Sequence, residues 1–318
     1  MPHPNMGNWR SKIAGKPVEY TRATSVQDLV SRRPAGAKMF EDLNVDLPEI
    51  GKSQDVVMRE AGGGYPNAEI YTPRGAGPFP VLLHIHGGGW FTGSAKGERK
   101  FAMQLCAAGF VVVNLNYRLA PEHPFPAGLQ DCIYAARWIV RNIAKYGGDA
   151  NRLAVGGGSA GGNLSACTTL ALHGSEEGLD GGDLAGVPVR FRGAVLHFGV
   201  LDVPRWIFEP HYYAGIAELF VTSYLGTNFT DRIRHPLVSP IHSPHLAKMP
   251  PTYISCGDED AFLSHSLAMT NALTLVDVPT TLSVVEGADH EFLKIPDRVE
   301  ESGPERERIV RWLHKHLK

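Results

Sequence analysis

The fold is decided by the stretch Leu153-Ala154-Val155-Gly156-Gly157-Gly158-Ser159-Ala160-Gly161-Gly162-Asn163-Leu164. An apolar run that stops at glycines, one serine and a return to helix-compatible residues predicts a strand, a tight turn and a helix. Residues 157–161 fit G-x-S-x-G, which is typical of a turn that holds a nucleophilic serine in a strained backbone at a helix N-terminus. Glycine is needed beside the serine because a Cβ there would collide with the neighbouring strand and helix. The stretch therefore predicts that Ser159 is a nucleophile.

The same stretch also satisfies the glycine fingerprint of dinucleotide-binding domains, because Gly156, Gly158 and Gly161 have the G-x-G-x-x-G spacing. That fingerprint should open the first strand–helix–strand unit of such a domain. Two strand–helix units precede it in this chain, so a nucleotide-binding oxidoreductase is the least favoured interpretation.

Strands and helices alternate along most of the chain, which predicts an α/β fold with a mostly parallel sheet covered by helices on both faces. The apolar runs that predict strands lie at residues 56–58, 68–72, 80–86, 110–115, 153–158, 191–198, 251–256 and 280–285. Helices are expected at about 97–108, 127–146, 160–172 and 264–275, and in a last segment that runs to 316.

Two segments interrupt this alternation. Residues 1–50 are mixed and mostly polar, and we interpret them as an N-terminal cap segment, with a helix over 25–40 broken at 33–36, packed on a catalytic domain of residues 51–318. Residues 203–229 are rich in aromatic side chains and predict a helical cap inserted above the sheet. The side chains predicted to contact a substrate are those of Trp90, Trp206, Phe208 and Tyr213.

The run His86-Gly87-Gly88-Gly89-Trp90 ends a predicted buried strand. A serine that attacks a carbonyl produces an oxyanion, and successive glycines can turn backbone N–H groups toward it without a side chain in the way. The place of this run upstream of the serine turn predicts an oxyanion hole.

A general base and a carboxylate follow the last two predicted strands. His290, in Glu286-Gly287-Ala288-Asp289-His290, is the natural base for Ser159, because α/β sheets place reactive groups at the carboxyl ends of their strands. Asp258, Glu259 and Asp260 are the candidates for the carboxylate that would orient it. The order serine, acid, histidine is the one expected of α/β-hydrolases.

Taken together, these motifs resemble the hormone-sensitive-lipase-like group of α/β-hydrolase carboxylesterases, from about residue 65 to the end of the chain. The resemblance also covers residues 117–127, Tyr-Arg-Leu-Ala-Pro-Glu-His-Pro-Phe-Pro-Ala. It implies a serine carboxylesterase that acts through an acyl-enzyme, on short-chain or aryl esters, without a cofactor or a metal. By resemblance, Ser159 is the nucleophile, His290 is the base, and Asp260, favoured over Asp258, is the acid that orients the base. The same resemblance assigns the oxyanion-hole N–H groups to Gly88, Gly89 and Ala160.

The sequence departs from the group at Gly158, where members usually carry an acidic residue. In the covered loop, Arg118 and Glu122 are expected to form a structural ion pair, and Asp131 to anchor its helix. Two further alternatives stay open: a non-catalytic small-molecule receptor on the same fold, and a lactonase or dehydratase that reuses the oxyanion hole.

Composition restricts the partners. The 318 residues are 43% hydrophobic and 20% charged with a formal net charge of −2, which argues against nucleic acid or an anionic membrane as a partner. The sequence shows neither a signal peptide nor a run long enough to span a bilayer. The four cysteines are expected to be buried free thiols, which predicts a cytoplasmic location. The protein is expected to bind a small-molecule ester, and a homodimer is the candidate assembly.

Overall fold

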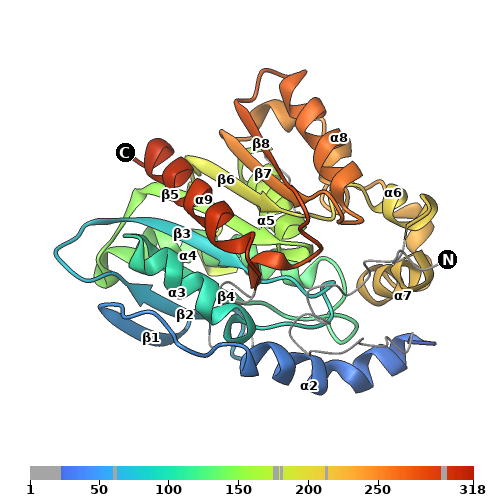
Figure 1. The fold of residues 1–318 in the computed structure, drawn as a ribbon, viewed down its shortest axis with the longest axis horizontal. Coiled ribbons are helices and arrows are strands. Elements are labelled where there is room, and N and C mark those ends of the chain that lie inside the picture. Colours follow the sequence, from blue (N-terminus) through green and yellow to red (C-terminus); the bar gives the residue numbers. More distant parts are fainter. Residues whose placement is uncertain (1–22, 60–62, 175–178, 180–181, 212–213, 295–298) are drawn as a thin grey trace.

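The structure, a computed structural model, describes residues 23–59, 63–174, 179, 182–211, 214–294 and 299–318. Within these residues, eight strands form one sheet in the order β1-β2-β4-β3-β5-β6-β7-β8 (Figure 1). The six strands from β4 to β8 in this order are mutually parallel, whereas β1 and β2 are antiparallel to their neighbours. The strands are β1 (Lys52–Val57), β2 (Asn67–Thr72), β3 (Phe79–Ile85), β4 (Val111–Asn116), β5 (Gly148–Gly158), β6 (Gly193–His197), β7 (Thr252–Gly257) and β8 (Thr280–Val285). The mostly parallel sheet predicted from the sequence is confirmed.

Helices cover both faces of the sheet, with α3 and α9 on one face and α4 and α5 on the other (Figure 1). The helices are α2 (Val26–Asp42), α3 (Arg99–Ala107), α4 (Ala127–Asn142), α5 (Ala160–Gly174), α6 (Val203–Phe208), α7 (Ala214–Leu225), α8 (Leu263–Thr274) and α9 (Ser302–His316). Residues 203–229, the predicted cap insertion, thus contain the helices α6 and α7.

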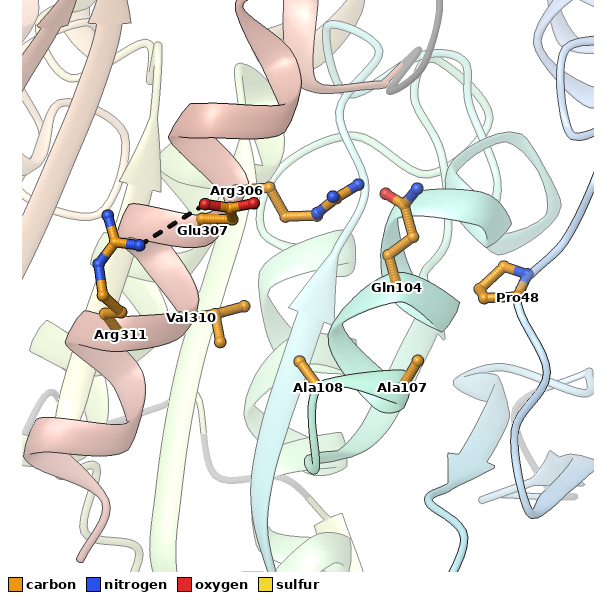
Figure 2. A pocket seen from close by; sticks show the side chains of 8 residues that line it. All are labelled: Pro48, Gln104, Ala107, Ala108, Arg306, Glu307, Val310 and Arg311. Atoms are coloured by element: carbon orange, nitrogen blue, oxygen red, sulfur yellow. Dashed lines mark ion pairs between the residues drawn. The ribbon is translucent and has the colours of Figure 1, made fainter.

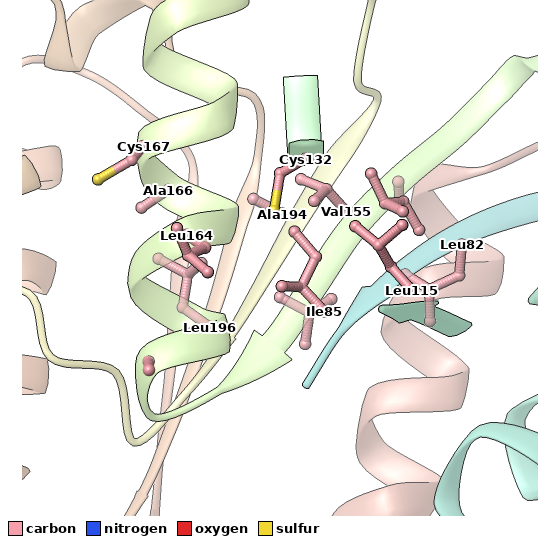
Figure 3. Close-up of a cluster of buried hydrophobic side chains, with 14 of the residues drawn as sticks. Leu82, Ile85, Leu115, Cys132, Val155, Leu164, Ala166, Cys167, Ala194 and Leu196 are labelled. Atoms are coloured by element: carbon pink, nitrogen blue, oxygen red, sulfur yellow. The ribbon is translucent and has the colours of Figure 1, made fainter. Parts of the chain in front are cut away.

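The core lies between the central strands and these helices. Strands β6 and β7 are buried along their whole length, as a parallel strand covered on both faces must be. Figure 3 shows apolar side chains of the strands meeting those of α4 and α5. The labelled residues are Leu82, Ile85, Leu115, Cys132, Val155, Leu164, Ala166, Cys167, Ala194 and Leu196.

The predicted break in the N-terminal helix is wrong. Helix α2 continues through Pro34, although a proline inside a helix removes a hydrogen bond and costs about 3 kcal/mol. Tertiary contacts hold the helix on the domain: the Arg33 guanidinium donates to the Glu122 carboxylate at 3.0 Å and to the Ala120 carbonyl at 2.8 Å. These contacts offset the intrinsic helix-breaking effect of the proline.

The predicted pair of Arg118 with Glu122 is also wrong. The Arg118 side chain instead donates to both oxygens of the buried Asp131 carboxylate, at 2.8 to 3.1 Å, and its backbone N–H donates to the same group at 2.8 Å. Glu122 pairs with Arg33 of α2. Asp131 therefore anchors α4 to the loop before it, as its expected role required, but through Arg118.

All four cysteines, Cys106, Cys132, Cys167 and Cys256, are buried and free, as predicted. None of the helices in the described part of the chain is both long enough and apolar enough to cross a bilayer.

Candidate active site

Ser159 lies in the turn between β5 and α5, with a φ of +56° that is rare for any residue other than glycine. This turn presses against the end of β3: a Cβ on Gly157 or Gly161 would lie 2.1 or 2.0 Å from the Ile85 carbonyl oxygen. The glycines therefore permit a contact that no side chain would allow, and the strained serine is held at the N-terminus of α5. The predicted strand-turn-helix geometry is confirmed.

A chain of hydrogen bonds connects Ser159 to two residues that are distant in sequence. His290 Nε2 lies 3.1 Å from Ser159 Oγ, and His290 Nδ1 lies 2.8 Å from Asp260 Oδ2. All three side chains are buried, with 5 to 7% of each residue exposed. Asp260 follows β7, and His290 follows β8, so the three groups come from the ends of the parallel strands β5, β7 and β8 at the same edge of the sheet.

The two aspartate candidates, Asp258 and Asp260, differ in their contacts. Asp260 receives His290 on one oxygen, and its other oxygen accepts the Phe262 N–H at 2.8 Å. Asp258 instead accepts the Gly287 N–H at 2.8 Å and so fastens the turn in which His290 lies. Of the two aspartates weighed from the sequence, Asp260 is the one placed beside the imidazole.

The electrostatic surroundings of His290 favour its protonated form. Burial alone would lower the pKa of the imidazole, but the Asp260 carboxylate outweighs burial through its charge and its hydrogen bond, and Glu291 and Asp289 add to the effect. The pKa of His290 is therefore raised above its ordinary value of 6.5. An imidazole in this setting can accept a proton from the serine and hold the resulting charge against Asp260.

The glycine loop after β3 lies beside the serine. A Cβ on Gly87 would lie 3.4 Å from the Ser159 Cβ, and Gly88 and Gly89 have φ values of +117° and +58°. In the described part of the chain, the N–H groups of Gly88, Gly89 and Ala160 donate to no protein acceptor. Positive φ values and open donors are what an oxyanion hole needs.

The side chains predicted to contact a substrate lie in different environments. Trp90 is buried, stacks on Tyr224 with ring centroids 4.4 Å apart, and donates to Asn163. Trp206 of α6 is also buried, against Phe262, whose ring in turn lies 5.0 Å from the His290 ring.

The two other predicted contacts lie further from this cluster or cannot be placed. Phe208, at the end of α6, is 69% exposed, so its ring faces solvent in this structure. Tyr213 lies outside the described residues.

The unusual glycine before the serine has a local explanation. A Cβ on Gly158 would lie 2.6 Å from Cε2 of Phe198, so the phenyl ring occupies the room that a side chain at 158 would need. The same ring contacts the His290 imidazole edge-on, with centroids 5.0 Å apart. Gly158 and Phe198 thus make this side of the imidazole apolar.

A hollow of the surface lies apart from this site. It has a volume of about 470 Å³ and lies between α3 and α9 (Figure 2). It is lined by Pro48, Gln104, Ala107, Ala108, Arg306, Glu307, Val310 and Arg311, and none of the candidate site residues is among them. No cluster of His, Cys, Asp and Glu suited to a metal ion occurs among the residues whose structure is described.

Comparison with known proteins gives the same fold. A family model described as the alpha/beta hydrolase fold matches residues 82–294. Carboxylesterase NlhH of Mycobacterium tuberculosis is 29% identical over 309 residues, covering 94% of this chain and 93% of that protein. The arylesterase of Saccharolobus solfataricus is 28% identical over 252 residues, covering 78% of this chain and 79% of that protein. A bacterial heroin esterase superposes with a TM-score of 0.80 at 26% identity, covering 98% and 97% of the two chains.

Replacing Asp260 should reveal its effect on the imidazole. We expect Asp260→Asn to lower the pKa of His290, because the opposite charge that stabilises the imidazolium is lost. Titration of the imidazole by NMR measures this shift. The buried His197, whose pKa burial lowers to about 3, supplies an internal control that should not move. An unchanged pKa of His290 in the variant would contradict the assigned pairing.

Proposed function

We propose that this chain, which belongs to the α/β-hydrolase family, is a carboxylesterase that forms an acyl-enzyme on Ser159. Its relatives include proteins named carboxylesterase and arylesterase, which support an ester as the substrate. The observation that carries the proposed mechanism is the hydrogen-bonded series from Ser159 Oγ through His290 to Asp260, at 3.1 and 2.8 Å.

In the proposed reaction, Ser159 Oγ attacks the carbonyl carbon of the ester while its proton passes to His290 Nε2. The carbonyl oxygen becomes an oxyanion, which the N–H groups of Gly88, Gly89 and Ala160 stabilise. His290 then gives the proton to the departing alkoxide, and the acyl group stays on the serine. A water molecule, deprotonated by His290, releases the acid and restores the enzyme. Only the neutral imidazole can accept the first proton, so the rate follows the deprotonated fraction of His290.

Replacing the nucleophile tests this mechanism. We expect Ser159→Ala to lower kcat for a chromogenic short-chain ester on the order of 10⁴-fold or more, because the covalent step is lost. A fluorophosphonate should label the parent protein at this residue, as mass spectrometry of the digest would show.

The matched control is Ser165→Ala on α5, where a buried hydroxyl donates to the Gly161 carbonyl away from the imidazole. This variant should keep its turnover and its label. Near-parental turnover by Ser159→Ala would exclude the nucleophile, and a folded parent protein without turnover of any ester would favour the receptor alternative.

The second part of the proposal concerns the segment 203–229 as a cap that acts on specificity. Phe91, in the loop after β3, packs on Phe220 of α7 with ring centroids 4.8 Å apart. Phe91 also belongs to a small apolar cluster with Ala23, just before α2, and Leu29 of α2. Trp206 reaches the imidazole through Phe262. This arrangement supports a roof of aromatic rings that would contact the acyl or alcohol part of a short-chain or aryl ester. Trp90, Phe208 and Tyr213 remain proposed contacts.

Shortening Trp206 tests the cap. We expect Trp206→Ala to change the ranking of kcat/KM across esters of increasing acyl length while acetate ester turnover persists, because the tryptophan contacts the substrate and not the reacting atoms. Leu275→Ala, at an exposed position after α8, is the control and should keep the parental ranking. A parental ranking in Trp206→Ala would remove this residue from the cap.

We also propose that the chain forms a homodimer through β8, a strand with one neighbour in the sheet and with Val284 46% exposed. Sedimentation equilibrium measures the mass: a dimer is expected, and a monomer at all concentrations would contradict it. A cytoplasmic location is proposed from the four free thiols.

A further inference from the structure

Three charged side chains are buried together behind the glycine loop, and the sequence motifs do not single them out. Glu98, Glu291 and Lys294 are 5 to 9% exposed. The Lys294 ammonium lies 2.7 Å from a carboxylate oxygen of Glu291 and 3.3 Å from one of Glu98. Removing one member of a buried ion pair leaves an uncompensated charge, so these three side chains depend on one another.

The Glu98 end of the cluster holds the glycine loop. Its Oε1 accepts the Gly87 N–H at 2.8 Å, and its Oε2 lies 2.7 Å from His84 Nε2 on β3. The Lys294 ammonium also lies close to this loop, since a Cβ on Gly87 would be 3.3 Å from it. Burial would raise the pKa of the Glu98 carboxyl, but Lys294 and His84 outweigh it and hold that pKa well below its usual range. Glu98 is therefore a charged acceptor at the base of the loop.

The Glu291 end of the cluster holds the turn that carries the base. Glu291 is the neighbour of His290 in the chain and has a positive φ of 67°. Lys294 follows three residues later in the short helix η8 (Phe292–Lys294), and its N–H donates to the Glu291 carbonyl at 2.9 Å. The cation therefore ties side chain and backbone of this turn together.

The open side of the cluster is covered by the N-terminal helix. The Lys294 ammonium lies 4.8 Å from the centre of the Phe40 ring of α2. A cation over an aromatic face is stabilised without being hydrated, so Phe40 helps to keep water from the cluster.

We propose that Lys294 is a positioning residue that bridges the glycine loop, through Glu98, and the His290 turn, through Glu291. This inference rests on the proposed function of Ser159 and His290. The bridge would fix the separation of the oxyanion donors from the base, two parts of the site that come from opposite ends of the chain. It also offsets the charge of the Glu291 carboxylate, the chain neighbour of His290.

Removing the cation tests the bridge on an ester with a chromogenic leaving group. We expect Lys294→Met to lower kcat on the order of 100-fold with little change in KM, because misplaced catalytic groups slow the chemical step more than binding. The pH of half-maximal rate on the acid side should rise, because the Glu291 charge, no longer offset by Lys294, adds to those of Asp260 and Asp289 around His290, which also contacts the rings of Phe198 and Phe262. Lys294→Arg should keep that pH.

The double variant Glu291→Gln/Lys294→Met separates charge from general destabilisation. The double variant should return the pH of half-maximal rate on the acid side to the parental value or below, since residue 291 no longer carries a charge beside His290. A mere loss of stability would not reverse the rise in that pH. Lys38→Met is the matched control: this lysine of α2 is exposed and pairs with Asp42, so its loss should leave kcat and the pH profile unchanged. Parental kcat and pH profile in Lys294→Met would overturn the proposal.

Two single variants decide the question if Lys294→Met does not fold. Each of Glu98→Gln and Glu291→Gln leaves the cation with one carboxylate. We expect the first to lower kcat and the second to lower the pKa of His290 measured by NMR, and parental values in both would overturn the bridge. The NMR pKa is independent of turnover, so an inactive parent protein would count against the proposed function alone.

Discussion

The close approach of the β5–α5 turn to the end of β3 is the contact on which the site depends. Glycines at 157 and 161 let the turn reach the Ile85 carbonyl, and any Cβ there would be about 2 Å from that oxygen. This contact sets the strained backbone of Ser159 and places the glycine loop after β3 beside the serine. An alanine at either glycine would push the ends of β3 and β5 apart. Ser159 and the glycine loop would then both be displaced, since both are attached to this contact.

The surroundings of the imidazole follow from that first contact. With the turn fixed, His290 is held from one side by Asp260 and from another by the Phe198 ring, which fills the room left by Gly158. A carboxylate gives the imidazole its basicity, and aromatic rings restrict how it can rotate. The glycine at 158 therefore leaves the room that the Phe198 ring occupies.

The sequence was sufficient for those parts of the structure that local patterns encode. The alternation of strands and helices, the serine turn and the glycine loop were all predicted, because glycine and β-branched residues restrict the backbone locally. The partners of Arg118, the continuation of α2 through Pro34 and the charge cluster at Lys294 were not. Each depends on side chains that meet in the folded chain, at separations from 3 to 196 residues. The contact of Phe198 with Gly158 cannot be predicted from sequence spacing either, because the ring belongs to the residue that follows the neighbouring strand β6.

The order of the sheet has a consequence for how much of the chain the proposed reaction needs. The glycine loop follows β3, and Ser159 follows β5. Asp260 and His290 follow β7 and β8, the last two strands described. Ser159 and His290 are 131 residues apart, so their contact closes a long loop of the chain. His290 follows β8, so a chain that ended before it would contain Ser159 without its proposed base. The proposed ester hydrolysis thus requires the segment that follows β8, although the proposed nucleophile follows β5.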